Sequence, residues 1–303
     1  MTASALLFDR AKRNVVDLWA LFALPVLIAL LPWSLGFRIL KQFARLEFVH
    51  RTSVENAWHV AQAHLPGVDE TRWKRRFRLL RLVERVDTWL TLLRSARWWQ
   101  THTRIDGVWP PAQQPWVLLT YHWGAGWWVW MPLRAHGIHA HFVARRAQAV
   151  DLGASRVALA YGKLRNRALI RIGSLGPIFV GGGAERMIEA LAANKSLVGM
   201  LDLPARAGQL AVRAPLLDGF VELPAGLARL AERNGIRVAL FSCGLDFATG
   251  SRDLRIEPLP PGLPIDEVMA RYVAHLDQRL REAPEAWQIW QEAGGMFVPG
   301  AEH

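Results

Sequence analysis

The chain has 303 residues, of which 51% are hydrophobic and 21% are charged, so it can bury a sizeable core. This composition excludes an intrinsically disordered chain, and the single cysteine, Cys243, excludes an intrachain disulfide framework. The 37 basic residues outnumber the 26 acidic ones and give a net charge of +11, which predicts an anionic partner such as an acidic carrier or an anionic lipid surface.

The first long feature is an uncharged stretch at residues 18–37, of about the 20 residues that span a bilayer core. Basic residues flank both sides, tryptophans lie near its ends, and Pro25 and Pro32 interrupt it. A buried core helix and a signal peptide are the alternatives, but no small-residue cleavage site follows the stretch. We expect residues 1–45 to form an N-terminal hydrophobic membrane anchor, either spanning or monotopic.

Residues 46–110 are predicted to be helical and strongly basic. Between residues 72 and 85, arginines and lysines alternate with phenylalanine, leucine and valine, a pattern that favours an amphipathic helix on a membrane surface. A solvated charged face on an ordinary helix is the alternative. No nucleic-acid recognition motif accompanies the charge, so we expect no nucleic acid as a partner.

Residues 111–303 have the texture of an α/β core. Short apolar runs alternate with helical stretches, which predicts a mostly parallel sheet flanked by helices, with the site at the carboxyl ends of the strands. The predicted strands are 116–121, 139–143, 176–180, 196–201 and 237–242, and the predicted helices are 126–133, 155–172, 184–193, 225–234 and 265–282.

The most promising chemical feature directly follows the first of these strands. His122 comes at the carboxyl end of the strand, and Gly124 and Gly126 form a turn into the next helix. A histidine in this place is positioned to act as a general base. The glycines let a substrate approach the backbone, and free amides at the helix start can receive negative charge. A lone histidine is often structural, so these residues alone leave both interpretations open.

Several motifs, in this order and spacing over about residues 15–295, resemble the lysophospholipid acyltransferase superfamily, and specifically its late (secondary) lipid A acyltransferase family. They are the N-terminal anchor, the strand ending in His122, HFVAR at 141–145, GGGAERMIEAL at 181–191, MLDLP at 200–204, APLLDGF at 214–220 and PEAWQIW at 284–290. The resemblance implies a glycerol-3-phosphate acyltransferase-like fold. It also implies an enzyme of the bacterial inner membrane, active on the cytoplasmic face, that needs no cofactor. Such an enzyme moves an acyl chain from a thioester donor, acyl carrier protein or acyl-CoA, to a lipid-like or amphipathic acceptor.

The family signature is a histidine, four residues, then an aspartate or glutamate, and here the acid position is Trp127. By resemblance, the histidine takes a proton from the acceptor hydroxyl while the acid orients the imidazole. Three accounts of the departure stay open. Asp202 or Asp218 replaces the acid, the acceptor is so easily activated that His122 suffices, or the chain binds lipid or carrier without acyl transfer. We expect His122 and Asp202 to be the catalytic residues.

The resemblance also implies the substrate contacts. Arg145 matches an arginine that is thought to bind a phosphate or the acyl donor, a task for which the forked guanidinium is suited. Trp127 and its neighbouring tryptophans are expected beside the acyl channel, which makes aryl-polyene pigment assembly a sub-hypothesis next to glycolipid synthesis. The remaining expected substrate contacts are Gly124, Gly126, Asp218 and Gly219.

Other candidates for chemistry are weaker. Three histidines at 136, 139 and 141 have no cysteine or carboxylate nearby in sequence, so we predict no metal site. Cys243 ends a buried strand and is expected to be a core residue rather than a nucleophile. A peripheral scaffold that uses the basic helix is a third class of function.

Overall fold

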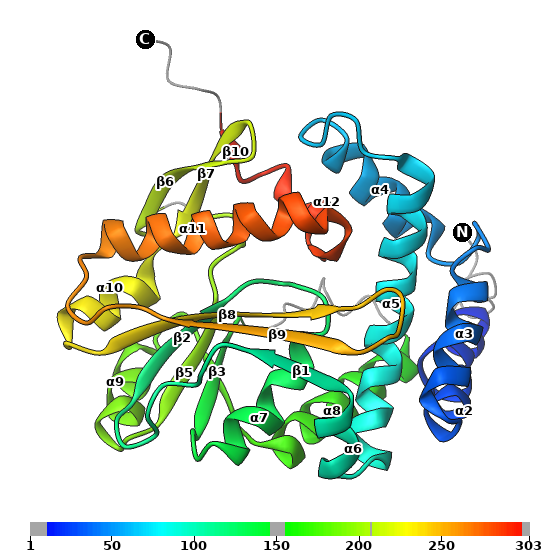
Figure 1. Cartoon of the computed structure of the whole chain (residues 1–303), viewed down its shortest axis with the longest axis horizontal. Coiled ribbons are helices and arrows are strands. Elements are labelled where there is room, and N and C mark those ends of the chain that lie inside the picture. Colours follow the sequence, from blue (N-terminus) through cyan, green and yellow to red (C-terminus); the bar gives the residue numbers. More distant parts are fainter. Residues whose placement is uncertain (1–10, 146–154, 207, 299–303) are drawn as a thin grey trace.

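The computed structural model describes residues 11–145, 155–206 and 208–298. Its centre is a seven-stranded sheet in the order β1-β9-β8-β2-β5-β3-β4 (Figure 1). The strands are β1 (Thr103–Asp106), β2 (Trp116–Thr120), β3 (Ala140–Ala144), β4 (Ser174–Phe179), β5 (Ser196–Met200), β8 (Arg237–Leu245) and β9 (Arg252–Pro258). β8, β2, β5, β3 and β4 run parallel, whereas β9 is antiparallel to β8 and parallel to β1. The predicted mostly parallel sheet is therefore confirmed.

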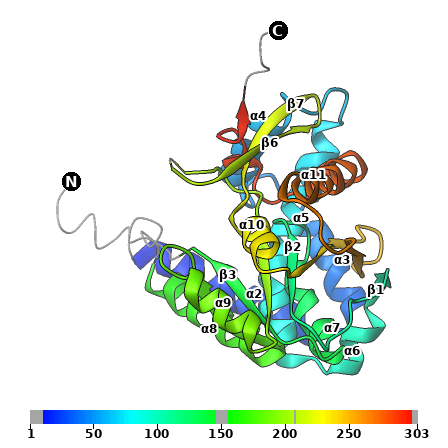
Figure 2. The ribbon, with the colours of Figure 1, turned by 90° about the vertical axis from the view of Figure 1, so that its left-hand side faces the viewer.

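Helices cover both faces of this sheet, as predicted. The described helices of the α/β part are η2 (Gly126–Val129), α7 (Trp130–Ala135), α8 (Arg156–Ile172), α9 (Ala184–Ala192), α10 (Gly226–Arg233), α11 (Ile265–Glu282), η3 (Pro284–Ala286) and α12 (Trp290–Ala293). The four apolar side chains of β2 alternate between two core clusters. Val117 and Leu119 pack on the face of α9, α10 and α11, and Trp116 and Leu118 pack on the face of α7. α8 contacts β4 and α7 and so covers the same face as α7, and Figure 2 shows it well away from α11.

A second sheet, which the sequence did not predict, lies over α11 (Figure 1). It is antiparallel and consists of β6 (Ala211–Leu216), β7 (Gly219–Pro224) and β10 (Phe297–Val298), in the order β10-β7-β6. Asp218 is exposed in the turn between β6 and β7, and Gly219 begins β7. The two residues thus belong to the smaller sheet.

The apolar N-terminal stretch forms two helices rather than one. Among the described residues, the helix Ala11–Leu30 is long and apolar enough to cross a membrane, by length and composition only. The chain then breaks at Leu31 and Pro32, and α3 (Trp33–Phe43) follows. Pro25 disturbs the first helix as well, because it has no N–H for the carbonyl of Leu21, and a π-helical turn, η1 (Leu18–Ala23), precedes it. The indole of Trp89 donates to the Leu21 carbonyl instead, at 2.9 Å.

The predicted basic helix is present, and it packs inside the protein along much of its surface. α5 (Glu70–Leu93) stands between the sheet and the N-terminal helices α2 (Leu24–Leu30) and α3 (Figure 1), and half of its residues are buried. Its cations serve the protein itself. Buried Arg78 donates to the carbonyls of Ala44 and Val49 at 2.9 and 2.8 Å, and Arg76 pairs with Glu285 at 2.6 Å. The sequence pattern showed where the charged residues of this helix lie. It could not show which carbonyl and carboxylate groups they contact in the folded protein.

Two short helices complete the N-terminal half. α4 (Arg51–Ala61) packs against α5 and α12, and α6 (Ala96–Thr101) leads into β1. A buried ion pair between Asp87 of α5 and Arg252 of β9 joins this half to the sheet. The Arg252 guanidinium also lies over the rings of Trp33 and Trp128, at 5.1 and 4.1 Å from their centroids. These contacts place α5 at the carboxyl end of β8, next to the expected site.

Candidate active site

Strand register brings His122 and Asp202 together. β2 and β5 are parallel neighbours, and Thr120 pairs with Met200 at their carboxyl ends. Two residues beyond each of these positions, the Nδ1 atom of His122 lies 2.9 Å from Oδ1 of Asp202. The carboxylate that is missing at position 127 thus has a counterpart on the neighbouring strand.

The Asp202 carboxylate is held in place by three hydrogen bonds. Its Oδ1 accepts from the imidazole, and its Oδ2 accepts from the backbone N–H of His122 at 2.7 Å and from the indole of Trp287 at 2.8 Å. The residue has no exposed surface. With Nδ1 donating to the carboxylate, the imidazole has its Nε2 lone pair free to accept a proton.

The ends of the two strands are joined by a tyrosine from α11. The hydroxyl of buried Tyr272 donates to the carbonyl of Thr120 at 2.9 Å and accepts from the amide of Leu201 at 3.2 Å. One side chain thereby fixes the backbone two residues before His122 and one residue before Asp202. The spacing of the pair follows from a contact made in the middle of a helix far along the chain.

The turn after His122 packs on β8 and on the η3 region. Gly124 has φ +50°, and a Cβ there would come within 2.5 Å of the Cys243 carbonyl oxygen. The Gly124 amide donates to Ala286 at 2.9 Å, and its carbonyl accepts from the Gln288 side chain at 2.6 Å. The predicted substrate approach therefore does not take place at Gly124, which approaches the protein's own backbone. Gly126 is exposed, with open space around its Cα.

The imidazole sits in a partly desolvated, negatively charged setting. The His122 side chain is 27% exposed. Burial lowers the pKa of His122. The charge and hydrogen bond of Asp202, with smaller contributions from Glu292 and Glu84, raise it by more than burial lowers it. The pKa of His122 is therefore above its ordinary value of 6.5. The carboxylate thus stabilises the charged imidazolium that a general base becomes.

Trp127, at the family's acid position, faces α8 instead of His122. The Arg165 guanidinium lies 4.4 Å from the centroid of the Trp127 ring and pairs with Glu84 at 2.9 Å. The other two tryptophans expected at an acyl channel, Trp128 and Trp130, are buried in the core. Of the three, only Trp127 is left partly accessible.

The remaining predicted site residues fall in two groups. Arg145 directly follows β3, the neighbour of β5, and is exposed at the same edge of the sheet as His122. Asp218 and Gly219 lie on the second sheet, and no hydrogen bond or ion pair described for them joins them to the His122–Asp202 pair. Burial raises the pKa of the Cys243 thiol to about 12, which leaves it a neutral core residue.

Metal binding finds no support among the described residues, where no group of three or more histidine, cysteine, aspartate or glutamate side chains could hold an ion.

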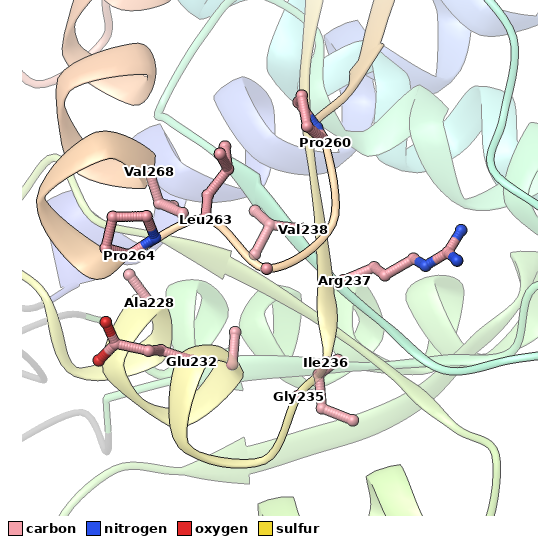
Figure 3. Close-up of a pocket in the computed structure, with 12 residues that line it drawn as sticks. Ala228, Glu232, Gly235, Ile236, Arg237, Val238, Pro260, Leu263, Pro264 and Val268 are labelled. Atoms are coloured by element: carbon pink, nitrogen blue, oxygen red, sulfur yellow. The ribbon is translucent and has the colours of Figure 1, made fainter.

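Of the cavities formed by the described residues, two near the sheet can be placed, and His122 lines neither of these two. One, of about 260 Å³, is at the opposite edge, where β8 begins (Figure 3). It is mainly apolar, and Glu232 and Arg237 carry its charges on opposite sides. The other, of about 390 Å³, lies beyond the turn that follows His122 and is lined by Trp123, Arg279 and Glu282 among others.

Several residues of the site were missed by the sequence analysis. Trp287 lies in a motif that was noticed, but its indole had no assigned role. Glu84 and Arg165 carried no signal, because each sits in a helix rich in charged residues, and Tyr272 could not be told from the other core residues of its helix. Comparison of this chain with models of known protein families, and with curated protein sequences, finds no match.

Proposed function

We propose that this protein is a membrane-associated acyltransferase with a glycerol-3-phosphate acyltransferase-like fold. It moves an acyl chain from a thioester donor, acyl carrier protein or acyl-CoA, to the hydroxyl of a lipid-like or amphipathic acceptor. The observation that supports it most is the Asp202 carboxylate, 2.9 Å from His122 Nδ1. Of the three accounts of Trp127, this contact favours replacement of the acid by another strand-end carboxylate.

The proposed chemistry follows from the tautomer that Asp202 imposes. His122 Nε2 removes the proton of the acceptor hydroxyl as its oxygen attacks the thioester carbonyl. The new C–O bond gives a tetrahedral oxyanion, which collapses with cleavage of the C–S bond. The imidazolium then returns its proton to the departing thiolate. Asp202 keeps the imidazole oriented throughout and balances its positive charge.

The surroundings suit a substrate that arrives from a membrane. The first helix carries large apolar side chains that are more than half exposed, at Val15, Val16, Leu18, Trp19, Leu27 and Leu30. Exposed apolar surface of this kind fits insertion into a lipid layer. The net charge of +11 fits an acidic carrier and an anionic leaflet. The cytoplasmic face of a bacterial inner membrane, and glycolipid or aryl-polyene assembly, belong to the proposal.

The test is acyl transfer by the detergent-solubilised full chain. Acyl carrier protein and CoA thioesters of several chain lengths are offered with amphipathic alcohols as acceptors, and acceptor-dependent thiol release is measured. We expect His122→Ala to reduce turnover to the background rate. The matched control is His59→Ala, which changes another helix-surface histidine. A folded wild type that binds these donors but releases no thiol with any acceptor would establish the binding-only alternative instead.

A further inference from the structure

The geometry of Trp127, Arg165 and Glu84 points to an anion-binding position beside His122, where the Arg165 guanidinium takes a phosphate group of a substrate. The inference rests on the proposed function, because the phosphate belongs to the acyl donor or to the acceptor of that reaction. It also gives position 127 a task that a carboxylate could not perform, since an acid there would neutralise the guanidinium.

The Arg165 guanidinium is held in one orientation, but not all of its hydrogen-bond donors are used. It projects from α8 with its guanidinium over the indole of Trp127, and Nη2 donates to Oε1 of Glu84 at 2.9 Å. Within the part of the chain that the structure describes, its Nε and Nη1 have no acceptor. The side chain is 38% exposed. A planar fork with one edge free, held on an aromatic face, has the geometry that binds a phosphate through two parallel hydrogen bonds.

The single carboxylate does not cancel the positive charge. Glu84 lies among Arg165, Arg81 and Arg85, and Arg81 approaches it to 3.5 Å. Burial would raise the pKa of Glu84, but these three arginines lower it below its ordinary value, so the carboxylate stays ionised. Asp17 is the other acid near Arg85. Three guanidinium groups against two carboxylates leave a net positive charge.

The position is close to the reacting atoms without occupying them. Trp127 lies in η2, five residues after His122, and the charge of Glu84 reaches the His122 imidazole. An anion held by Arg165 therefore lies beside η2, the helical turn that follows the His122 loop, and does not use the imidazole. Position 127 thus contributes to substrate orientation, while Asp202 contributes to proton transfer.

Direct binding to two matched pairs of probes tests the inference and identifies the source of the phosphate. 4′-Phosphopantetheine is compared with pantetheine, and lysophosphatidic acid with the monoacylglycerol of the same chain, by calorimetric titration of the full chain in one detergent. We expect wild type to bind the phosphate-bearing member of at least one pair about tenfold more tightly. Preference within the first pair assigns the phosphate to the donor, and preference within the second assigns it to the acceptor.

Variants then assign the preference to this residue. Arg165→Gln should abolish it, and Arg165→Lys should reduce it, because lysine keeps the charge but not the fork. Arg167→Gln is the matched control: it makes the same change on the same helix, at an exposed position about 200° away. Trp127→Leu should weaken the preference, and Trp127→Phe should keep most of it.

Two results would overturn the inference: a wild type without preference in either pair, or a preference that survives in Arg165→Gln. His122→Ala should keep the preference while losing acyl transfer. If the folded wild type lacks acyl transfer but shows a preference that depends on Arg165, then the proposed function fails and the anion position stands.

Discussion

Replacing Asp202 with asparagine probes the proposed mechanism most directly, because the structure predicts which way the new amide turns. Two N–H groups, from the His122 backbone and from Trp287, point at Oδ2. The amide oxygen of asparagine must take that place, since its NH₂ would meet two donors there. The NH₂ group then faces His122 Nδ1, which has to accept. The proton of the neutral imidazole moves to Nε2, and the base is lost.

The expected loss of turnover in Asp202→Asn is large, although asparagine has almost the same shape as aspartate. In a serine protease, the corresponding aspartate-to-asparagine change leaves the geometry intact and lowers turnover about 10⁴-fold, or about 5 kcal/mol in the barrier. We expect a loss of this order in kcat, with KM changed little. The loss of the carboxylate charge also lowers the pKa of His122. The base must be neutral, so the wild-type rate should rise with pH through a pKa above 6.5. The acid limb of the pH–rate profile of Asp202→Asn should lie at lower pH.

The assay is acceptor-dependent thiol release over pH 5 to 9, with Asp69→Asn as the control. That variant makes the same change at the N-cap of α5, where asparagine caps as well as aspartate does. Circular dichroism and thermal unfolding verify that both variants are folded. Turnover of Asp202→Asn within threefold of wild type, or an acid limb that does not move, would refute the assignment of Asp202.

Three further outcomes are expected. Adding Trp127→Glu to Asp202→Asn should restore no activity in the thiol-release assay, because position 127 faces α8. Recovery of activity would mean that a carboxylate at position 127 can reach His122. Burial and nearby arginines lower the pKa of His50 to about 3, so the stability that its neutral form provides is complete above pH 6.5 and is lost as the pH falls toward 3. Urea titrations should show wild type losing about 2 kcal/mol more than His50→Asn between pH 7 and 5, and equal losses would contradict this; asparagine tolerates the left-handed backbone there. Leu27→Gln should lower flotation with anionic vesicles about tenfold, whereas Ile188→Gln on α9 should leave it unchanged, and equal flotation of both would count against insertion of the first helix.

The central strands β2, β5 and β8 could be predicted because they are buried almost throughout and read as mainly apolar runs. β9 was not predicted from the sequence, because it alternates buried residues with partly exposed charged residues and pairs with an antiparallel neighbour. The small sheet escaped because its two longer strands expose every second side chain and include Pro215 and Pro224. Periodicity in sequence shows which side chains avoid water, and it says little about strands that are half in water.

The candidate pair could be proposed from the sequence because His122 and Asp202 each follow a strand. Their contact could not be derived, since it requires β2 and β5 to be neighbours, and two other strands lie between them in the chain. The hydrogen bond from Trp287 joins positions 85 residues apart, and no local pattern encodes it. The apolar N-terminal stretch was found by its length, but its break at Pro32 and its packing on α5 depend on tertiary contacts.

The hydrogen bonds between the turn after His122 and the segment after α11 have a consequence for biosynthesis. Gln288 binds the backbone of the turn on both sides of Trp123, and Ala286 accepts the Gly124 amide. A nascent chain synthesised only as far as α11 already carries the imidazole and its carboxylate but lacks the contacts that aim them. The site is therefore complete only after the segment that carries Ala286 and Gln288 has been synthesised, long after the first helix.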